Sequence, residues 1–311
     1  MYNDDICALP IHTSTTVNKK KYYLAAIAAY AIWGTFSLVL RPLKEYASLD
    51  ILFYRIFLCA VLVLAIMLLF RTKVLRENIA MFKALPRQAK NKVLLLNLSG
   101  GLLLTANWFC FIYVMNHVSV QVTSLAYLVC PILTTMLAHF ILKERLSKVQ
   151  WLSVWLSVVG CALLSYNHAM DIVYSLLVGS SYAVYLVSQK RNVGFDKFFI
   201  LTVQVVFSAL LLLPFYPAMH EAIPTAVSFY GLITVIAVLF TIVPLLLNLY
   251  ALKGINSSTS GMLLNINPLL AFTLAFVVFK EPVDITQVVA YGIIAIAVLV
   301  FNATFILGKG K

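Results

Sequence analysis

A few polar and aromatic side chains interrupt the long apolar stretches of this sequence, and together they could hold a small solute. Arg55 is the one cation well inside an apolar run, where a guanidinium can bind a carboxylate or a phosphate. A lining of aromatic rings, amides and one cation suits amphipathic, zwitterionic or anionic metabolites better than inorganic ions. The residues predicted to bind substrate are Trp33, Arg55, Asn107, Trp108, Tyr127, Tyr182, Tyr185, Asn248, Asn265 and Asn267.

Each of these residues also has a purely structural alternative. Arg55 could extend to the outer lipid headgroups, or pair with Asp50 or with carbonyls at a helix end. Amides at membrane depth usually form hydrogen bonds between helices, so each Asn could serve helix packing instead of binding. Trp33 lies near the middle of its apolar run, away from the interfacial aromatic belt, and either packs in the core or lines a cavity.

One motif occurs twice in the chain. The stretch "CPILTTMLAHFILKERL" (130–146) aligns without gaps with "NPLLAFTLAFVVFKEPV" (267–283). Charged residues are only 11% of the chain, so a Lys-Glu pair repeated at a fixed distance after a proline indicates an internal duplication. The three telling matches are Pro131 with Pro268, Lys143 with Lys280, and Glu144 with Glu281.

The repeated prolines are predicted to be hinges. Proline donates no backbone hydrogen bond and clashes with the carbonyl four residues earlier, here that of Tyr127 or Leu264. At membrane depth a freed carbonyl is tolerated only where protein or water satisfies it. Pro131 and Pro268 are therefore expected beside the solute path, with packed kinks that only shape the bundle as the alternative.

The repeated glutamates close their apolar runs. A structural role as loop anchors is the main expectation for Glu144 and Glu281, and proton carriage is the alternative. His139, about one turn from the end of the same run as Glu144, either titrates or is simply hydrogen-bonded. Because the acidic residues fall in the tail, the connections and the ends of runs, we expect downhill transport or exchange rather than strict proton coupling.

Membrane helices are the elements that must position these residues. Hydrophobic residues make up 62% of the chain, against roughly 45–50% in soluble domains, so we expect an all-α integral membrane protein. Basic residues cluster in short connections instead of forming a stripe on a soluble face, which argues against a nucleic-acid partner. No two of the five Cys residues have a CxxC spacing, and no metal or cofactor is expected.

Ten apolar runs are long enough to cross a bilayer, which takes about 20 helical residues. Ten spans place both termini on one side, and the positive-inside rule makes that side cytoplasmic. Of the 23 Lys and Arg residues, only Arg41, Lys44 and Lys280 then fall in outer connections. The runs are 22–42, 50–70, 93–115, 119–142, 149–167, 171–189, 198–216, 227–250, 257–279 and 286–307.

The two copies of the motif lie five spans apart, an odd number, so they must be inverted with respect to each other. Two inverted five-helix repeats are typical of transporters that expose one site to alternate sides of the membrane. The expected organisation is a cytoplasmic tail (1–21), a first repeat (22–167), a second repeat (168–307) and a short cytoplasmic tail (308–311). The basic segment 71–92 is expected to be a long loop that has no counterpart in the second repeat.

The chain resembles the EamA-type drug/metabolite transporters, and within them the RarD-like branch. The resemblance covers residues 22 to 307 and is carried by "ANWFCFIYVMNHVSVQVTSLAYLVCPILTTMLAHFILKERLSKVQWLSV" (106–154), which holds Asn107-Trp108, a Tyr four residues before a Pro, and Glu144-Arg145-Leu146 followed by Gln150-Trp151. Cys130 departs from the pattern, in which Asn is usual, whereas Asn267 keeps the Asn. The resemblance implies a carrier of small metabolites or drugs in the bacterial inner membrane.

A secondary transporter that exports or exchanges a small organic solute by alternating access is therefore the leading hypothesis. It is expected to act as a monomer or homodimer within the lipid bilayer. A non-transporting membrane scaffold or sensor is the alternative, although it would normally add a soluble domain. A membrane enzyme acting on lipid is disfavoured, because no catalytic motif and no cluster of carboxylates or histidines occurs at a shared depth.

Overall fold

The protein, described here by a computed structural model, is a bundle of helices. The structure describes residues 19–117, 120–165, 169–219, 223–280 and 282–303, and within these ranges every regular element is helical. In the first half the helices are α1 Lys20–Gly34, α2 Ser37–Leu40, η1 Arg41–Leu43, α3 Ser48–Leu69, α4 Thr72–Ala84, α5 Arg87–His117, α6 Val120–Leu142, α7 Lys148–Leu164 and α8 Ala169–Lys190. In the second half they are α9 Lys197–Leu212, η2 Leu213–Phe215, α10 Tyr216–Met219, α11 Val227–Ala237, η3 Val238–Ile242, α12 Val243–Ala251, α13 Ser257–Leu263, α14 Ile266–Val277 and α15 Ile285–Phe301.

Eight helical stretches in the described part of the chain have the length and the hydropathy needed to cross a membrane. Two more apolar helices, α7 and α15, are shorter, with 17 residues each in the described ranges. They pack against one another at one edge of the bundle. Large apolar side chains face outward, as expected for contact with lipid; Trp155 on α7, for example, is 66% exposed.

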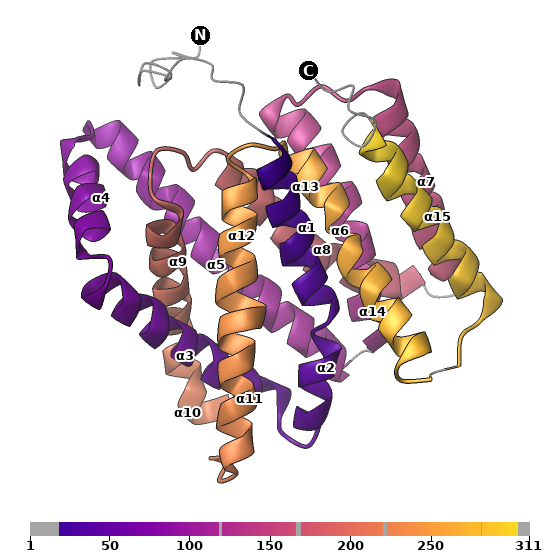
Figure 1. Cartoon of the computed structure of the whole chain (residues 1–311), viewed down its shortest axis with the longest axis horizontal. Coiled ribbons are helices and arrows are strands. Elements are labelled where there is room, and N and C mark those ends of the chain that lie inside the picture. The colour runs from indigo at the N-terminus through magenta and orange to yellow at the C-terminus, as the bar shows by residue number, and fades with distance from the viewer. Residues whose placement is uncertain (1–18, 118–119, 166–168, 220–222, 281, 304–311) are drawn as a thin grey trace.

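Figure 1 shows the two ends of the bundle. The start of α1, the end of α12, the start of α13 and the end of α15 lie together at one end, which we call the α13 end. The short helices α2 and η1 and the start of α11 lie at the opposite end, the η1 end. The central contacts run between α6 and α8, α6 and α13, α1 and α12, and α5 with α8 and α9.

The helices that meet at the centre are brought together by glycines. A methyl group added to Gly261 on α13 would lie 2.7 Å from Cβ of Thr134 on α6. One added to Gly179 on α8 would lie 3.0 Å from the carbonyl oxygen of Ala126, also on α6. Small residues at such crossings let the backbones approach closely, which is the usual way that membrane helices pack.

The two repeated prolines, Pro131 and Pro268, affect their helices differently. Before Pro268, α13 ends at Leu263 and α14 begins at Ile266, and the carbonyl oxygen of Leu264 accepts a hydrogen bond from the backbone N–H of Asn267 at 3.0 Å. Pro131, its sequence counterpart, lies inside a continuous α6. The two motifs therefore differ in conformation: the second half breaks at its proline and the first half does not.

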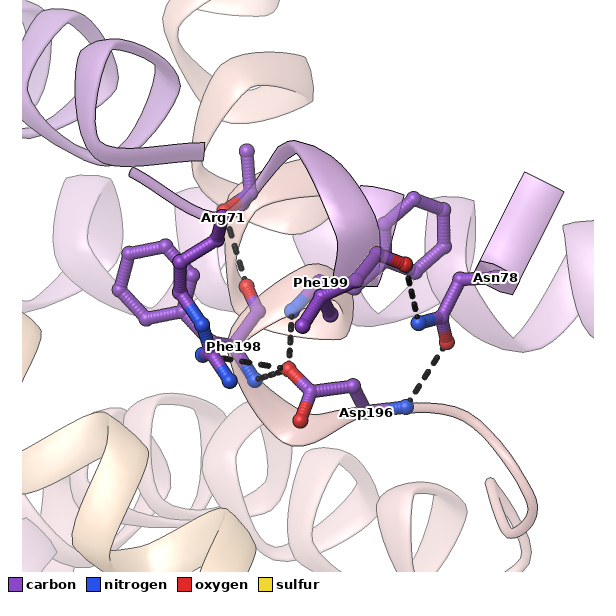
Figure 2. Close-up of polar contacts among 7 residues, drawn as sticks. Arg71, Asn78, Asp196, Phe198 and Phe199 are labelled. Atoms are coloured by element: carbon purple, nitrogen blue, oxygen red, sulfur yellow. Dashed lines mark hydrogen bonds and ion pairs between the residues drawn. The ribbon is translucent and has the colours of Figure 1, made fainter. Parts of the chain in front are cut away.

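The basic segment 71–92 differs from the sequence expectation, because most of it is helical. Helix α4 occupies residues 72–84, and α5 begins at Arg87. Two apolar side chains of α4 at helical spacing, Leu75 and Phe82, pack against the core of the bundle, a signal that the many charges obscured. Figure 2 shows the polar anchor of α4: Asn78 accepts a hydrogen bond from the backbone N–H of Asp196, and Arg71 forms an ion pair with the Asp196 carboxylate at 3.4 Å.

Candidate functional site

A cavity of about 540 Å³ opens between the two halves of the chain. It is lined by α1, α2, η1 and α3, by the last third of α5, by α6 and α8, and by η3, α12 and α14. Its lining reaches from Trp33 and Tyr182 in the middle of the bundle to the exposed residues Arg41 and Lys44 at the η1 end. The cavity thus connects the centre of the bundle with that end.

Aromatic rings form the inner wall of the cavity. The Trp33 and Tyr182 rings meet edge to face with centroids 5.9 Å apart. Tyr185, which is not itself part of the lining, stacks on Tyr182 at 5.5 Å. Trp33 is held in place because its indole Nε1–H donates to the carbonyl oxygen of Phe240 at 2.8 Å. These fixed rings present apolar faces at about the mid-depth of the bundle.

The Phe240 carbonyl is available because of Pro244, which the sequence analysis did not single out. Pro244 lies four residues after Phe240 and has no N–H to donate to it. Around this point the helix widens to a π-helix, η3, a feature that often marks functional sites. A proline four residues after an aromatic residue in an apolar run was the available sequence signal.

Next to the rings, a hydrogen-bonded cluster joins four helices at the centre of the bundle. The Asn248 amide donates to the Tyr182 hydroxyl at 2.8 Å and accepts from the hydroxyls of Tyr30 (3.1 Å) and Ser260 (3.2 Å). Four different helices (α1, α8, α12 and α13) meet in this cluster. Asn248 thus joins helices beneath the cavity and is not itself part of its lining.

Arg55 lines the cavity at its α3 wall. Its guanidinium carbon lies 5.4 Å from the centre of the Trp108 ring, in the range of a cation–π contact. Its Nε is buried and has no hydrogen-bond partner. Within the described part of the chain, Arg55 forms no ion pair, and the cavity lining contains no Asp or Glu.

Two further polar side chains reach the cavity wall. Asn107 is buried and already donates to the Val178 carbonyl at 3.0 Å and to the Ser181 hydroxyl at 3.1 Å, so α8 fixes its orientation. The Ser37 hydroxyl, missed by the sequence analysis, is buried in the lining without a partner. Its isolated position in a short apolar helix gave no pattern by which to find it.

At the α13 end of the bundle, Glu144 joins the segment after α6 to the start of α13. Its carboxylate accepts hydrogen bonds from the backbone N–H groups of Ser257 (2.8 Å) and Ser258 (3.0 Å), and from the Ser258 hydroxyl at 2.6 Å. Asn256, the N-cap of α13, makes no side-chain capping bond, so Glu144 supplies this cap from the connection between α6 and α7.

The repeated Lys residues have a conformational basis at the ends of α6 and α14. Lys143 has φ +56° and Lys280 has φ +54°, the two non-glycine residues with positive φ in the described part of the chain. Each lies just past the end of its helix, where a left-handed residue terminates an α-helix. His139 adds to the first of these caps, because its Nδ1 lies 2.8 Å from the Glu144 carbonyl oxygen.

Two basic side chains tie further segments together at the α13 end. The Lys190 ammonium donates to the carbonyl oxygens of Leu252 (2.7 Å) and Ile255 (2.6 Å), beyond the end of α12. The Arg191 guanidinium donates to the carbonyl oxygen of Ile141 at 2.6 Å, near the end of α6. With Glu144, these bonds join the ends of α6, α8, α12 and the start of α13.

The structure divides the predicted binding residues into two groups. Trp33, Arg55, Asn107, Trp108, Tyr127, Tyr182 and Asn267 line the cavity. Tyr185, Asn248 and Asn265 do not: Tyr185 donates to Gln204 at 3.3 Å, and Asn265 donates to the Met262 carbonyl at 3.3 Å. Glu281 lies outside the described residues. Among the residues described, no group of three or more His, Cys, Asp or Glu side chains could hold a metal.

The sequence model of the EamA-like transporter family matches this chain twice, over residues 20–166 and 170–303. The chain belongs to this family. Two proteins with similar sequences are the uncharacterized transporter YojE of Bacillus subtilis strain 168 (26% identical; 91% of this chain and 94% of YojE) and RarD of Escherichia coli K12 (26%; 89% and 92%). RarD of Streptomyces exfoliatus is 30% identical over 55% of this chain and 52% of its own length. A solved crystal structure shares this EamA fold with a TM-score of 0.72 at 14% identity, covering 93% of this chain and 98% of that one.

Proposed function

We propose that this membrane transporter carries a small organic solute through the cavity between its halves by alternating access. The observation that carries this proposal is a cavity that is open toward the η1 end while the α13 end is tied shut by Glu144, Lys190 and Arg191. A carrier caught in one of its two states has such an arrangement. Export or exchange is the mode that we propose, with no strict coupling to protons.

The proposed architecture is ten spans arranged as two inverted repeats, 22–167 and 168–307. The double match to the family and the repeated left-handed Lys at the ends of α6 and α14 support it. The shorter helices α7 and α15 are the fifth and tenth spans in this scheme. The excess of basic residues at the α13 end supports an inner-membrane orientation with both termini cytoplasmic and the cavity open to the outside.

The proposal is tested by solute exchange with purified protein in liposomes, using a panel of labelled metabolites with and without a pH gradient. The matched variants are Trp33→Ala, which removes the inner wall of the cavity, and Trp155→Ala on the exposed face of α7. We expect at least one solute to exchange, with loss of exchange in Trp33→Ala and near-normal exchange in Trp155→Ala. Equal loss in both variants would contradict the assigned route, and no exchange of any solute would favour a scaffold or sensor.

A further inference from the structure

The charge of the cavity identifies the chemical class of its ligand. The cavity is lined by three basic residues, Arg41, Lys44 and Arg55, and by no Asp or Glu within the described part of the chain. Arg41 and Lys44 lie at the exposed η1 end, where the Arg41 guanidinium carbon is 3.4 Å from the centre of the Phe279 ring. Arg55 lies deeper, beside Trp108 and Tyr127.

Arg55 is placed to bind a ligand and does not behave as a structural cation. A guanidinium held at membrane depth for structural reasons pairs with a carboxylate, binds carbonyls or extends to headgroups. None of the hydrogen bonds in the described part of the chain involves the Arg55 guanidinium, and its Nε is buried without a partner. The cation–π contact with Trp108 satisfies none of the guanidinium N–H groups with an oxygen acceptor, so they remain available for an oxyanion.

The rest of the lining suits an organic body attached to that anion. Trp33, Phe111, Tyr127, Tyr182 and Phe240 present rings to the cavity. A volume of about 540 Å³ is far larger than an inorganic anion needs and is typical of sites for small organic molecules. The buried Ser37 hydroxyl offers one more hydrogen bond in the same lining.

We infer that the transported solute is an organic anion whose carboxylate or phosphate pairs with Arg55 while its apolar or aromatic part packs against the rings. The claim that the anion is transported rests on the proposed function. Its binding at Arg55 can be measured without transport. Arg55 is then the specificity residue of the site, since a neutral analogue leaves its partly buried charge unpaired.

Binding is measured by the fluorescence of the cavity tryptophans. The protein contains four Trp residues, and changing Trp151 and Trp155 to Phe leaves Trp33 and Trp108, which both line the cavity. The probes are phenylacetate, phenylacetamide and phenethylamine, which share a ring and differ in charge. We expect phenylacetate to bind roughly ten- to hundredfold more tightly than phenylacetamide, because charged hydrogen bonds have this range of strength.

Two variants separate binding from structure. Arg55→Gln is expected to remove the preference for phenylacetate, and Arg55→Lys is expected to keep part of it. If Arg55 binds ligand, Arg55→Gln unfolds at the same or a higher temperature, because an unpaired, partly buried charge has been removed. Replacing a structural cation would instead lower that temperature. No preference for phenylacetate in the wild type, or an unchanged preference in Arg55→Gln, would overturn the inference.

Two further measurements complete the test. Phosphatidylglycerol added to the detergent micelles competes with phenylacetate only if a lipid headgroup occupies the site, and such competition would overturn the assignment to a soluble anion. The liposome experiment of the preceding section remains independent. Exchange of neutral solutes alone would leave the carrier function standing and refute the anion, whereas Arg55-dependent binding without exchange would support the anion site and contradict transport.

Discussion

Replacement of Glu144 should open the α13 end of the bundle. The Glu144 carboxylate accepts three hydrogen bonds from Ser257 and Ser258 at the first turn of α13. Hydrogen bonds to a charged group are worth about 1.5–3 kcal/mol each, and an anion at a helix N-terminus adds about 0.3–1 kcal/mol. Because Glu144 is partly exposed, solvent weakens these terms, and we take about 2–3 kcal/mol for the whole cap.

That free energy corresponds to a roughly 30- to 150-fold shift in the equilibrium between the closed and open α13 end. The shift favours the open end in Glu144→Ala if the cap exists only when this end is closed. Glu144→Gln keeps one oxygen acceptor and should have an intermediate effect. Glu77→Ala is the matched control, since Glu77 is an exposed acid on α4 whose contact with Lys73 is 4.0 Å long.

The assay is pulsed electron paramagnetic resonance with spin labels on Lys148→Cys and Lys253→Cys, two exposed positions, in a background without other cysteines. We expect the label distances to lengthen or broaden in Glu144→Ala and to stay unchanged in Glu77→Ala. Hydrogen exchange at the Ser257 and Ser258 amides should accelerate at least about tenfold, because both lose their acceptor. Unchanged distances together with unchanged exchange would refute the role of Glu144 in holding this end shut.

Three other changes test the remaining structural arguments. Pro268→Ala restores a backbone donor where α13 and α14 separate, so solute exchange should fall while the unfolding temperature is kept; normal exchange would make Pro268 a packing feature. Gly261→Val should destabilise the protein by about 1–3 kcal/mol in denaturant unfolding, because even a methyl group would lie 2.7 Å from Cβ of Thr134. In intact cells, Lys44→Cys should react with an impermeant thiol reagent and Lys148→Cys should not; the reverse pattern would invert the proposed orientation.

Family and helix positions were determined by the sequence, because both depend on local information. Hydropathy over a window of about 20 residues located every long apolar helix that the structure describes, and the repeated Pro, Lys and Glu pointed to the EamA-like family. Depth along a helix follows from 1.5 Å per residue. The sequence could therefore place Trp33, Arg55 and Tyr182 well inside the bundle, where the cavity lies.

Only the tertiary structure decided which way each polar side chain faces. A membrane helix is apolar on nearly all sides, so its sequence has no amphipathic signal to distinguish a cavity face from a packing face. Asn107 and Asn248 have the same chemistry, yet one lines the cavity and the other joins α1, α8, α12 and α13 beneath it. The bond between Glu144 and the start of α13 joins residues more than a hundred positions apart, and only the packing of α6 against α13 brings them together.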